Sequence, residues 1–258
     1  MPGRTRKAFT PVRPSAVRQQ GFTLVELLVV VAIIALLAGI LVPTFRRGID
    51  LAYRARCQGN LKEIARACKS YARMDRNHRG STKDAMPNVG VTGSNWSDPA
   101  AGNRGCMWLL VEYGYASTGT FYCPALKEYV EAKKSDGQFK PNTCGYSFVS
   151  MIGRTLTTLT LDSSTILAGD KNPCYYYEGN SFRTRAGMEH ENSMSHGKRN
   201  GKYEGQNVSF LDESVEWKTE PKVWFASQDD WIYHDGDLGL DGDPTTDPKG
   251  VIETYLIP

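Results

Sequence analysis

The chain has 258 residues, which suits one domain or one domain with appendages, and its hydrophobic fraction of 40% is ordinary for a globular protein. The net charge is +3, but five basic residues and no acidic one lie within residues 1–21, so the remainder is slightly acidic. This balance excludes a global positive field, and no stripe of Arg and Lys interleaved with aromatic residues occurs. Nucleic acid is therefore not an expected partner.

Residues 22–45 form an apolar run, FTLVELLVVVAIIALLAGILVPTF, in which Glu26 is the one charged residue. As a helix this run extends about 36 Å, enough to cross a hydrocarbon core of about 30 Å. It is too long for the apolar part of a secretory signal peptide, and no A-x-A cleavage site follows it. Basic residues flank the run on both sides, so charge alone only weakly favours a cytoplasmic location for residues 1–21.

Glu26 needs an explanation, because a carboxylate within a membrane costs about 3 kcal/mol or more unless it is paired. One explanation is that the side chain reaches the interface and contacts water. The other is that cleavage before Phe22 creates an α-ammonium group, which pairs with Glu26 of a neighbouring subunit. Farther along, Pro43 with Gly39 nearby predicts a kink or local melting of the helix.

The stretch QQGFTLVELLVVVAIIALLAGILVP resembles the leader and first helix of type IV prepilins and type II secretion pseudopilins. The resemblance implies that Gly21 is the last leader residue, Phe22 the N-methylated first residue of the mature protein, and Glu26 the assembly carboxylate. It implies a prepilin peptidase, an inner-membrane assembly platform and other pilin or pseudopilin subunits as partners. It also places the leader in the cytoplasm before processing and the head outside it, anchored by a single span and later part of a filament.

An amphipathic pattern follows the apolar run. Apolar residues recur every three or four positions, at Tyr53, Cys57, Leu61, Ile64, Cys68 and Tyr71. This spacing predicts a helix that lies on a core and continues the membrane helix to about Met74. Cys57 and Cys68 are about 16 Å apart along a regular helix, so they cannot form a disulfide with each other. We expect them to be buried as small apolar residues.

The six cysteines show no CxxC pair and no Cys/His spacing typical of a zinc site. In an exported protein they can form disulfides, and the sequence does not rank the possible pairings. We expect at least one bridge among Cys106, Cys123, Cys144 and Cys174.

The rest of the chain predicts an α+β head with an antiparallel sheet. GCMWLLVEYGY indicates a short helix, and CGYSFVSMIG, SSTILAGD and QNVSFLDESVEW indicate strands, the last forming a β-hairpin with its turn at residues 211–214. The expected organisation is a leader at 1–21, a transmembrane and assembly helix at 22–45, and a head at 46–258. Within this type IV pilin fold, 46–75 is the amphipathic helix and 76–258 the sheet and loops.

Three segments, ARCQGNLKEIARACKSYA, FYCPAL and SHGKRNGKYEGQNVSFLDESVEW, resemble a bacterial group of large pilin-like proteins. That group typically shows a Cys-x-x-Asn-Leu helix, a Phe-Tyr-Cys-Pro turn and a His ahead of an Asp-Gly hairpin. His196 and Asp212 match the last pair, and we expect them to stabilise a turn or to pack rather than to catalyse. Glu213 replaces the usual Gly, so we expect the tight turn to take another form.

The segment HDGDLGLDGDPTTD gathers five carboxylates, those of Asp235, Asp237, Asp241, Asp243 and Asp247. Hard oxygen ligands at this density suit calcium, and the segment is similar in composition to the calcium-holding loop of major pseudopilins. It is not an EF-hand, because Thr246 or Pro248 stands where the bidentate Glu is needed. A solvated acidic turn is the alternative.

Enzyme motifs of the types G-x-S-x-G, P-loop, G-x-G-x-x-G and H-E-x-x-H do not occur. We therefore expect a structural subunit of a type IV pilus or a type II secretion pseudopilus rather than an enzyme. The alternative is a singly anchored periplasmic ligand-binding module or enzyme, for which the N-terminal helix is a tether.

Overall fold

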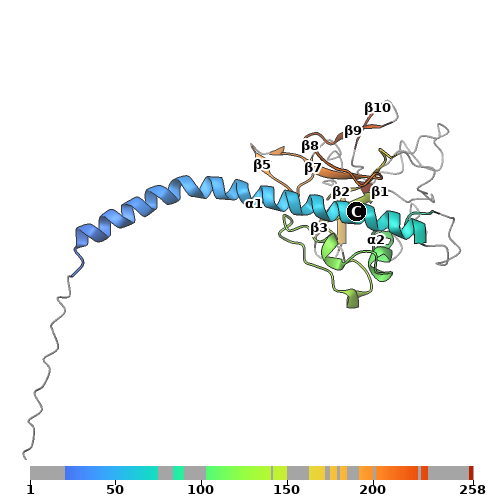
Figure 1. Cartoon of the computed structure of the whole chain (residues 1–258), viewed down its shortest axis with the longest axis horizontal. Coiled ribbons are helices and arrows are strands. Elements are labelled where there is room, and N and C mark those ends of the chain that lie inside the picture. The colour runs from blue at the N-terminus through green and yellow to red at the C-terminus, as the bar shows by residue number, and fades with distance from the viewer. Residues whose placement is uncertain are drawn as a thin grey trace, which may run out of the picture. The chain divides into compact units, whose positions relative to one another are not determined.

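A computed structural model describes residues 21–74, 84–89, 103–140, 142–149, 163–171, 175–178, 181–184, 192–199, 202–225, 228–231 and 256–257. The chain divides into two compact units, Met1–Arg46 and Arg47–Pro258. Helix α1, Leu24–Met74, begins in the first unit and ends in the second (Figure 1).

The predicted long helix is confirmed, with its end at Met74. Pro43 lies inside α1, and the helix continues through it. The backbone therefore does not melt at this point. Next to the proline, the hydroxyl of Thr44 donates a hydrogen bond to the carbonyl of Leu41 at 2.8 Å.

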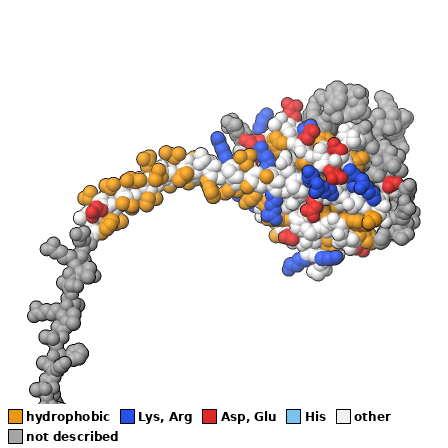
Figure 2. Space-filling view, in the orientation of Figure 1, with side chains coloured by type: hydrophobic (Ala, Val, Ile, Leu, Met, Phe, Trp, Pro, Cys, Tyr) orange, Lys and Arg blue, Asp and Glu red, His pale blue; other side chains and the backbone are white. Residues whose placement is uncertain are grey.

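The part of α1 in the first unit exposes its apolar side chains. It contains a stretch that is long and apolar enough to cross a membrane, and none of that stretch is buried. Leu24, Leu36 and Phe45 are among the exposed residues. Hydrophobic side chains cover the visible face of this part of the helix in Figure 2. An exposed surface of this composition suggests anchoring in a membrane.

The second half of α1 forms one wall of the core of the head. Its buried residues follow the predicted spacing of three and four, at Cys57, Leu61, Ile64, Cys68 and Tyr71. They belong to one hydrophobic cluster with residues of α2, Asn103–Glu112, and of the sheet. The α+β fold, a long N-terminal helix packed on a head with an antiparallel sheet, is thus confirmed.

The sheet has five strands in the order β11-β1-β2-β7-β8, all antiparallel to their neighbours. The strands are β1 Tyr146–Val149, β2 Ile166–Asp170, β7 Gln206–Phe210, β8 Val215–Lys218 and β11 Leu256–Ile257. The predicted strands correspond to β1, β2, β7 and β8. Asp170, the last residue of β2, lies opposite Tyr146, the first residue of β1.

Shorter elements surround the sheet among the described residues. They are the 3-10 helices η1 Thr118–Phe121 and η2 Lys134–Asp136, and the hairpins of β3 Tyr175–Glu178 with β4 Ser181–Thr184, β5 Lys198–Arg199 with β6 Lys202–Tyr203, and β9 Lys222–Phe225 with β10 Gln228–Trp231. Helix α2 is the predicted short helix, and Gly114 follows it with a φ of 78°. This left-handed residue suits a helix C-terminus.

The predicted hairpin of β7 and β8 is confirmed, with its turn at residues 211–214. Asp212 stabilises the turn, because its carboxylate accepts a hydrogen bond from the backbone N–H of Ser214 at 2.8 Å. Glu213 has a φ of 73°, the left-handed conformation that favours glycine. The expectation that replacing glycine gives the turn another form is therefore wrong. Glu213 instead forms ion pairs with Arg66 at 3.3 Å and Lys69 at 3.0 Å, which join the turn to α1.

Candidate functional site

Helix α1 starts at a capping box formed by Thr23 and Glu26. One carboxylate oxygen of Glu26, Oε2, accepts hydrogen bonds from the backbone N–H of Thr23 at 2.8 Å and from its hydroxyl at 2.7 Å. In return the hydroxyl oxygen of Thr23 accepts a bond from the backbone N–H of Glu26 at 3.2 Å. Such reciprocal bonds satisfy donors that the first turn of a helix otherwise leaves unpaired. The Thr-x-x-Glu spacing is typical of a capping box. The two explanations of Glu26 given above consider only its charge and do not include this contact.

The capping box gives Glu26 a second role within its own subunit. Gly21 and Phe22 precede the helix outside regular secondary structure, and both are exposed, as is Glu26. Both capping bonds end on Oε2, so Oε1 accepts no hydrogen bond from the described part of the chain. The carboxylate can therefore cap its own helix and still offer an oxygen to another group. Cleavage after Gly21 and pairing of Glu26 with a neighbouring subunit stay predictions.

Several predicted features lie outside the described residues. Residues 1–20 of the leader and Cys174 belong to this group, as does the whole acidic segment with Asp235, Asp237, Asp241, Asp243 and Asp247. Calcium binding therefore stays a prediction. The described cysteines, which include Cys106, Cys123 and Cys144, are free, so the expected bridge is not found among these three.

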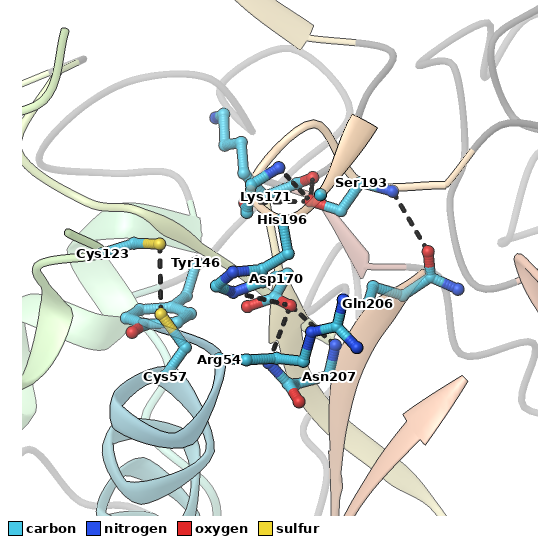
Figure 3. Close-up of polar contacts among 12 residues, drawn as sticks. Arg54, Cys57, Cys123, Tyr146, Asp170, Lys171, Ser193, His196, Gln206 and Asn207 are labelled. Carbon is cyan, nitrogen blue, oxygen red and sulfur yellow. Dashed lines mark hydrogen bonds and ion pairs between the residues drawn. The ribbon is translucent and has the colours of Figure 1, made fainter. Parts of the chain in front are cut away.

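A buried polar cluster occupies the centre of the head (Figure 3). The sulfur atoms of Cys57 on α1 and Cys123 after η1 lie 3.2 Å apart, although 66 residues separate them in the chain. His196, which precedes β5, and Asp170 at the end of β2 complete the cluster. Cys57, Cys123 and Asp170 are fully buried, and His196 is 1% exposed.

Two local features bring Cys123 to α1. The side-chain amide of Asn60, one helical turn after Cys57, donates to the carbonyl of Tyr122 at 3.0 Å and to the hydroxyl of Tyr146 at 2.9 Å. Gly145 makes room on the other side, because a Cβ atom there would lie 2.7 Å from the Cβ of Cys123. The backbone N–H of Gly145 also donates a hydrogen bond to the carbonyl of Phe121 at 2.9 Å. The loop that carries Cys123 is thus held between α1 and the start of β1.

Asp170 is oriented by β7 and faces His196. Its Oδ2 atom accepts hydrogen bonds from the backbone N–H of Asn207 at 2.6 Å and from its side-chain amide at 3.1 Å. The Nε2 atom of His196 lies 3.5 Å from the same oxygen. Burial lowers the pKa of His196, but the carboxylate of Asp170, with Cys123 and Asp50 farther out, outweighs burial and raises it overall. His196 therefore pairs with Asp170, whereas Asp212, the other residue that the motif singled out, stabilises the turn between β7 and β8.

The two thiols have unequal acidity. The hydrogen bond that they share lowers the pKa of Cys123, while the same bond and burial raise the pKa of Cys57.

The sequence singled out the Cys-x-x-Asn-Leu helix, the Phe-Tyr-Cys-Pro turn and His196 separately. It gave no sign that their side chains meet, since each lies in a different local motif.

Comparison with known proteins identifies the N-terminal segment. A family model described as the prokaryotic N-terminal methylation motif matches residues 17–42. The match includes Gly21, Phe22 and Glu26 and most of the apolar run, so the chain has a prepilin-like N-terminus. Such a motif implies processing by a prepilin peptidase and association with a membrane. Neither curated proteins nor solved structures match the chain.

Proposed function

We propose that this protein is a structural subunit of a type IV pilus or a type II secretion pseudopilus. The observation that carries the proposal is the methylation motif at residues 17–42, which overlaps an apolar stretch of α1 that is not buried in the single chain. Before assembly the membrane covers this surface. After cleavage and extraction by an assembly platform, the equivalent helices of other subunits cover it.

Glu26 sets the register of assembly in this proposal. Cleavage after Gly21 gives Phe22 a positive α-ammonium, and an ion pair is stronger in an apolar environment than in water. A carboxylate without a partner is costly in the same environment. The unpaired oxygen of Glu26 is therefore offered to the Phe22 ammonium of a neighbouring subunit, while Oε2 keeps its bonds to Thr23.

The alternative is a periplasmic enzyme or ligand-binding module on a simple membrane tether. A tether needs only length and apolarity, and it gives no reason for a methylation motif at residues 17–42. The polar cluster of Cys57, Cys123, Asp170 and His196 is also buried, so a substrate would reach it only if the head opened. We therefore favour the filament subunit.

The test separates the two roles of Glu26. A Glu26→Gln variant keeps an oxygen for the capping box, since Gln also serves at this position, but it loses the negative charge. A matched Thr23→Ala variant loses the capping box but keeps the charge. Each full-length variant is expressed in cells that lack the parent gene. Processing is read from mass, and filaments are sheared and quantified.

We expect Glu26→Gln to be cleaved normally but to be nearly absent from filaments. Thr23→Ala should enter filaments, because the loss of a cap costs only about 1 kcal/mol. Glu26→Gln in filaments at the parental level would show that assembly does not use the charge. Membrane-bound parent protein that never enters sheared filaments would support the tethered module instead.

A further inference from the structure

Three side chains in the head form what we call the thiol–imidazole cluster: Cys57, Cys123 and His196. The atoms that each could offer to a metal ion, two sulfurs and one ring nitrogen, all lie within 4.8 Å of one another. Figure 3 shows the imidazole of His196 between the two sulfurs and the carboxylate of Asp170. All three residues are buried, so their arrangement is part of the folded head.

Packing alone does not explain His196. Its side chain is enclosed, yet neither ring nitrogen makes a hydrogen bond within the described part of the chain. The contact of 3.5 Å from Nε2 to Asp170 is longer than a good hydrogen bond. Nδ1 has not even such a contact within the described residues, and a buried polar atom without a partner costs about 1 to 3 kcal/mol. A cation bound between the imidazole and the thiols would remove this cost.

The donor set selects the kind of cation. Two thiolates and one imidazole suit zinc, whereas calcium and magnesium prefer oxygen. Two thiolates bound to a tetrahedral zinc lie about 3.8 Å apart. The sulfur atoms, now 3.2 Å apart, would need to separate only slightly. Both thiols must lose their protons on binding, and the charge of a bound zinc ion favours the thiolate forms.

Asp170 supplies the outer partner that zinc-binding histidines usually have. A histidine ligand commonly donates its other N–H to a carboxylate, which fixes the ring and makes it more basic. Because Nε2 is the nitrogen beside Asp170, Nδ1 is the nitrogen left for the ion. Asn207 holds that carboxylate through two hydrogen bonds. The cluster therefore has both a donor set and an orienting shell.

We propose that Cys57, Cys123 and His196 bind one zinc ion, with Asp170 as the positioning residue for the imidazole and a water molecule as the fourth donor. Because the site is buried, the ion joins α1 to the loop after η1 and to the loop before β5. It thereby stabilises the head around the helix that also carries the assembly surface. Zinc binding does not depend on the proposed filament function, so each can fail without the other.

The rival use of the two thiols is a disulfide. In it the sulfurs of Cys57 and Cys123 bond to each other, and two protons and two electrons pass to a disulfide-bearing oxidant of the cell envelope. That product accounts for the two cysteines but gives Nδ1 of His196 no partner. The two forms exclude each other, and chemical analysis separates them.

The test uses the full-length protein, solubilised in detergent from cell membranes without chelator or reductant. Metal content is measured by mass spectrometry, and cysteine state by peptide mapping after thiols are blocked. The variants are Cys57→Ser, Cys123→Ser and His196→Ala. His196→Cys keeps a zinc ligand at the same position. Cys68→Ser is the matched control, because Cys68 is equally buried on α1 but lies outside the cluster.

We expect about one zinc ion per chain in the parent protein, in Cys68→Ser and in His196→Cys. Cys57→Ser, Cys123→Ser and His196→Ala should lose most of it. A zinc chelator should lower the melting temperature of the parent but not that of Cys123→Ser. Far-ultraviolet circular dichroism shows which variants are folded, and rescue by His196→Cys answers the objection that His196→Ala fails only through misfolding.

Two results would overturn the proposal. One is a Cys57–Cys123 disulfide as the main form in the parent protein. The other is a parent chain with both thiols free that takes up no more zinc than Cys123→Ser when the metal is supplied.

Discussion

At the scale of single residues, Glu213 shows how a costly backbone conformation is retained. A residue other than glycine in the left-handed region costs about 1 kcal/mol. Two partly exposed ion pairs, with Lys69 and Arg66, can offset this, each contributing at most about 1 kcal/mol. Lys69 and Arg66 also lower the pKa of Glu213. The contribution of the pairs is therefore present at neutral pH and is lost as pH falls through that lowered pKa.

Two substitutions of Glu213 separate the effect of its backbone strain from the effect of its ion pairs. Glu213→Gly relieves the strain and loses the ion pairs, so we expect its melting temperature at neutral pH to stay within a few degrees of the parent. Glu213→Ala loses the pairs but keeps the strain, so it should melt clearly lower. Thermal unfolding of the purified full chain measures both. Equal melting of the Ala and Gly variants would mean that this turn stores no backbone strain.

At the scale of elements, Asn60 links α1 to the loop that carries Cys123. Asn60→Ala leaves the carbonyl of Tyr122 and the hydroxyl of Tyr146 without this donor. We expect a loss of stability of about 1 kcal/mol or more, because the site is only partly open to water. Gln58→Ala on the same helix is the control and should change little. Urea unfolding of the full chain compares them, and equal midpoints would contradict the linking role.

The sequence predicts elements well where a repeating pattern runs long enough. The apolar run and the spacing from Tyr53 to Tyr71 identify α1, and two short strand-like runs on either side of a turn identify β7 and β8. Strands of two residues such as β5 and β6 are too short to show a repeating pattern of apolar and polar residues, so the sequence does not predict them.

The buried cluster could not be predicted for a related reason. The contact of Cys57 with Cys123 joins segments 66 residues apart, and no local pattern encodes it. Asp170 reads as the end of an ordinary strand, and its contact with His196 follows only from how β2 lies against the rest of the head. By contrast, Gly21, Phe22 and Glu26 stand in one short motif, so the sequence could single them out.

At the scale of the whole molecule, the two compact units answer different demands. Met1–Arg46 carries a methylation motif and an apolar surface that needs a membrane or other helices to cover it. Arg47–Pro258 has its own core, to which the second half of α1 contributes. A prepilin-like N-terminus followed by a separately packed head is consistent with the filament subunit proposed above.

The mature N-terminus tests this account most directly. Protein is recovered from membranes and from sheared filaments of the same cells, and its N-terminal peptide is measured by mass spectrometry. The account predicts a chain that begins at Phe22, carries a methyl group on the α-nitrogen, and is present in both fractions. A mature chain that retains residues 1–21, or one that begins beyond the apolar run, would contradict it.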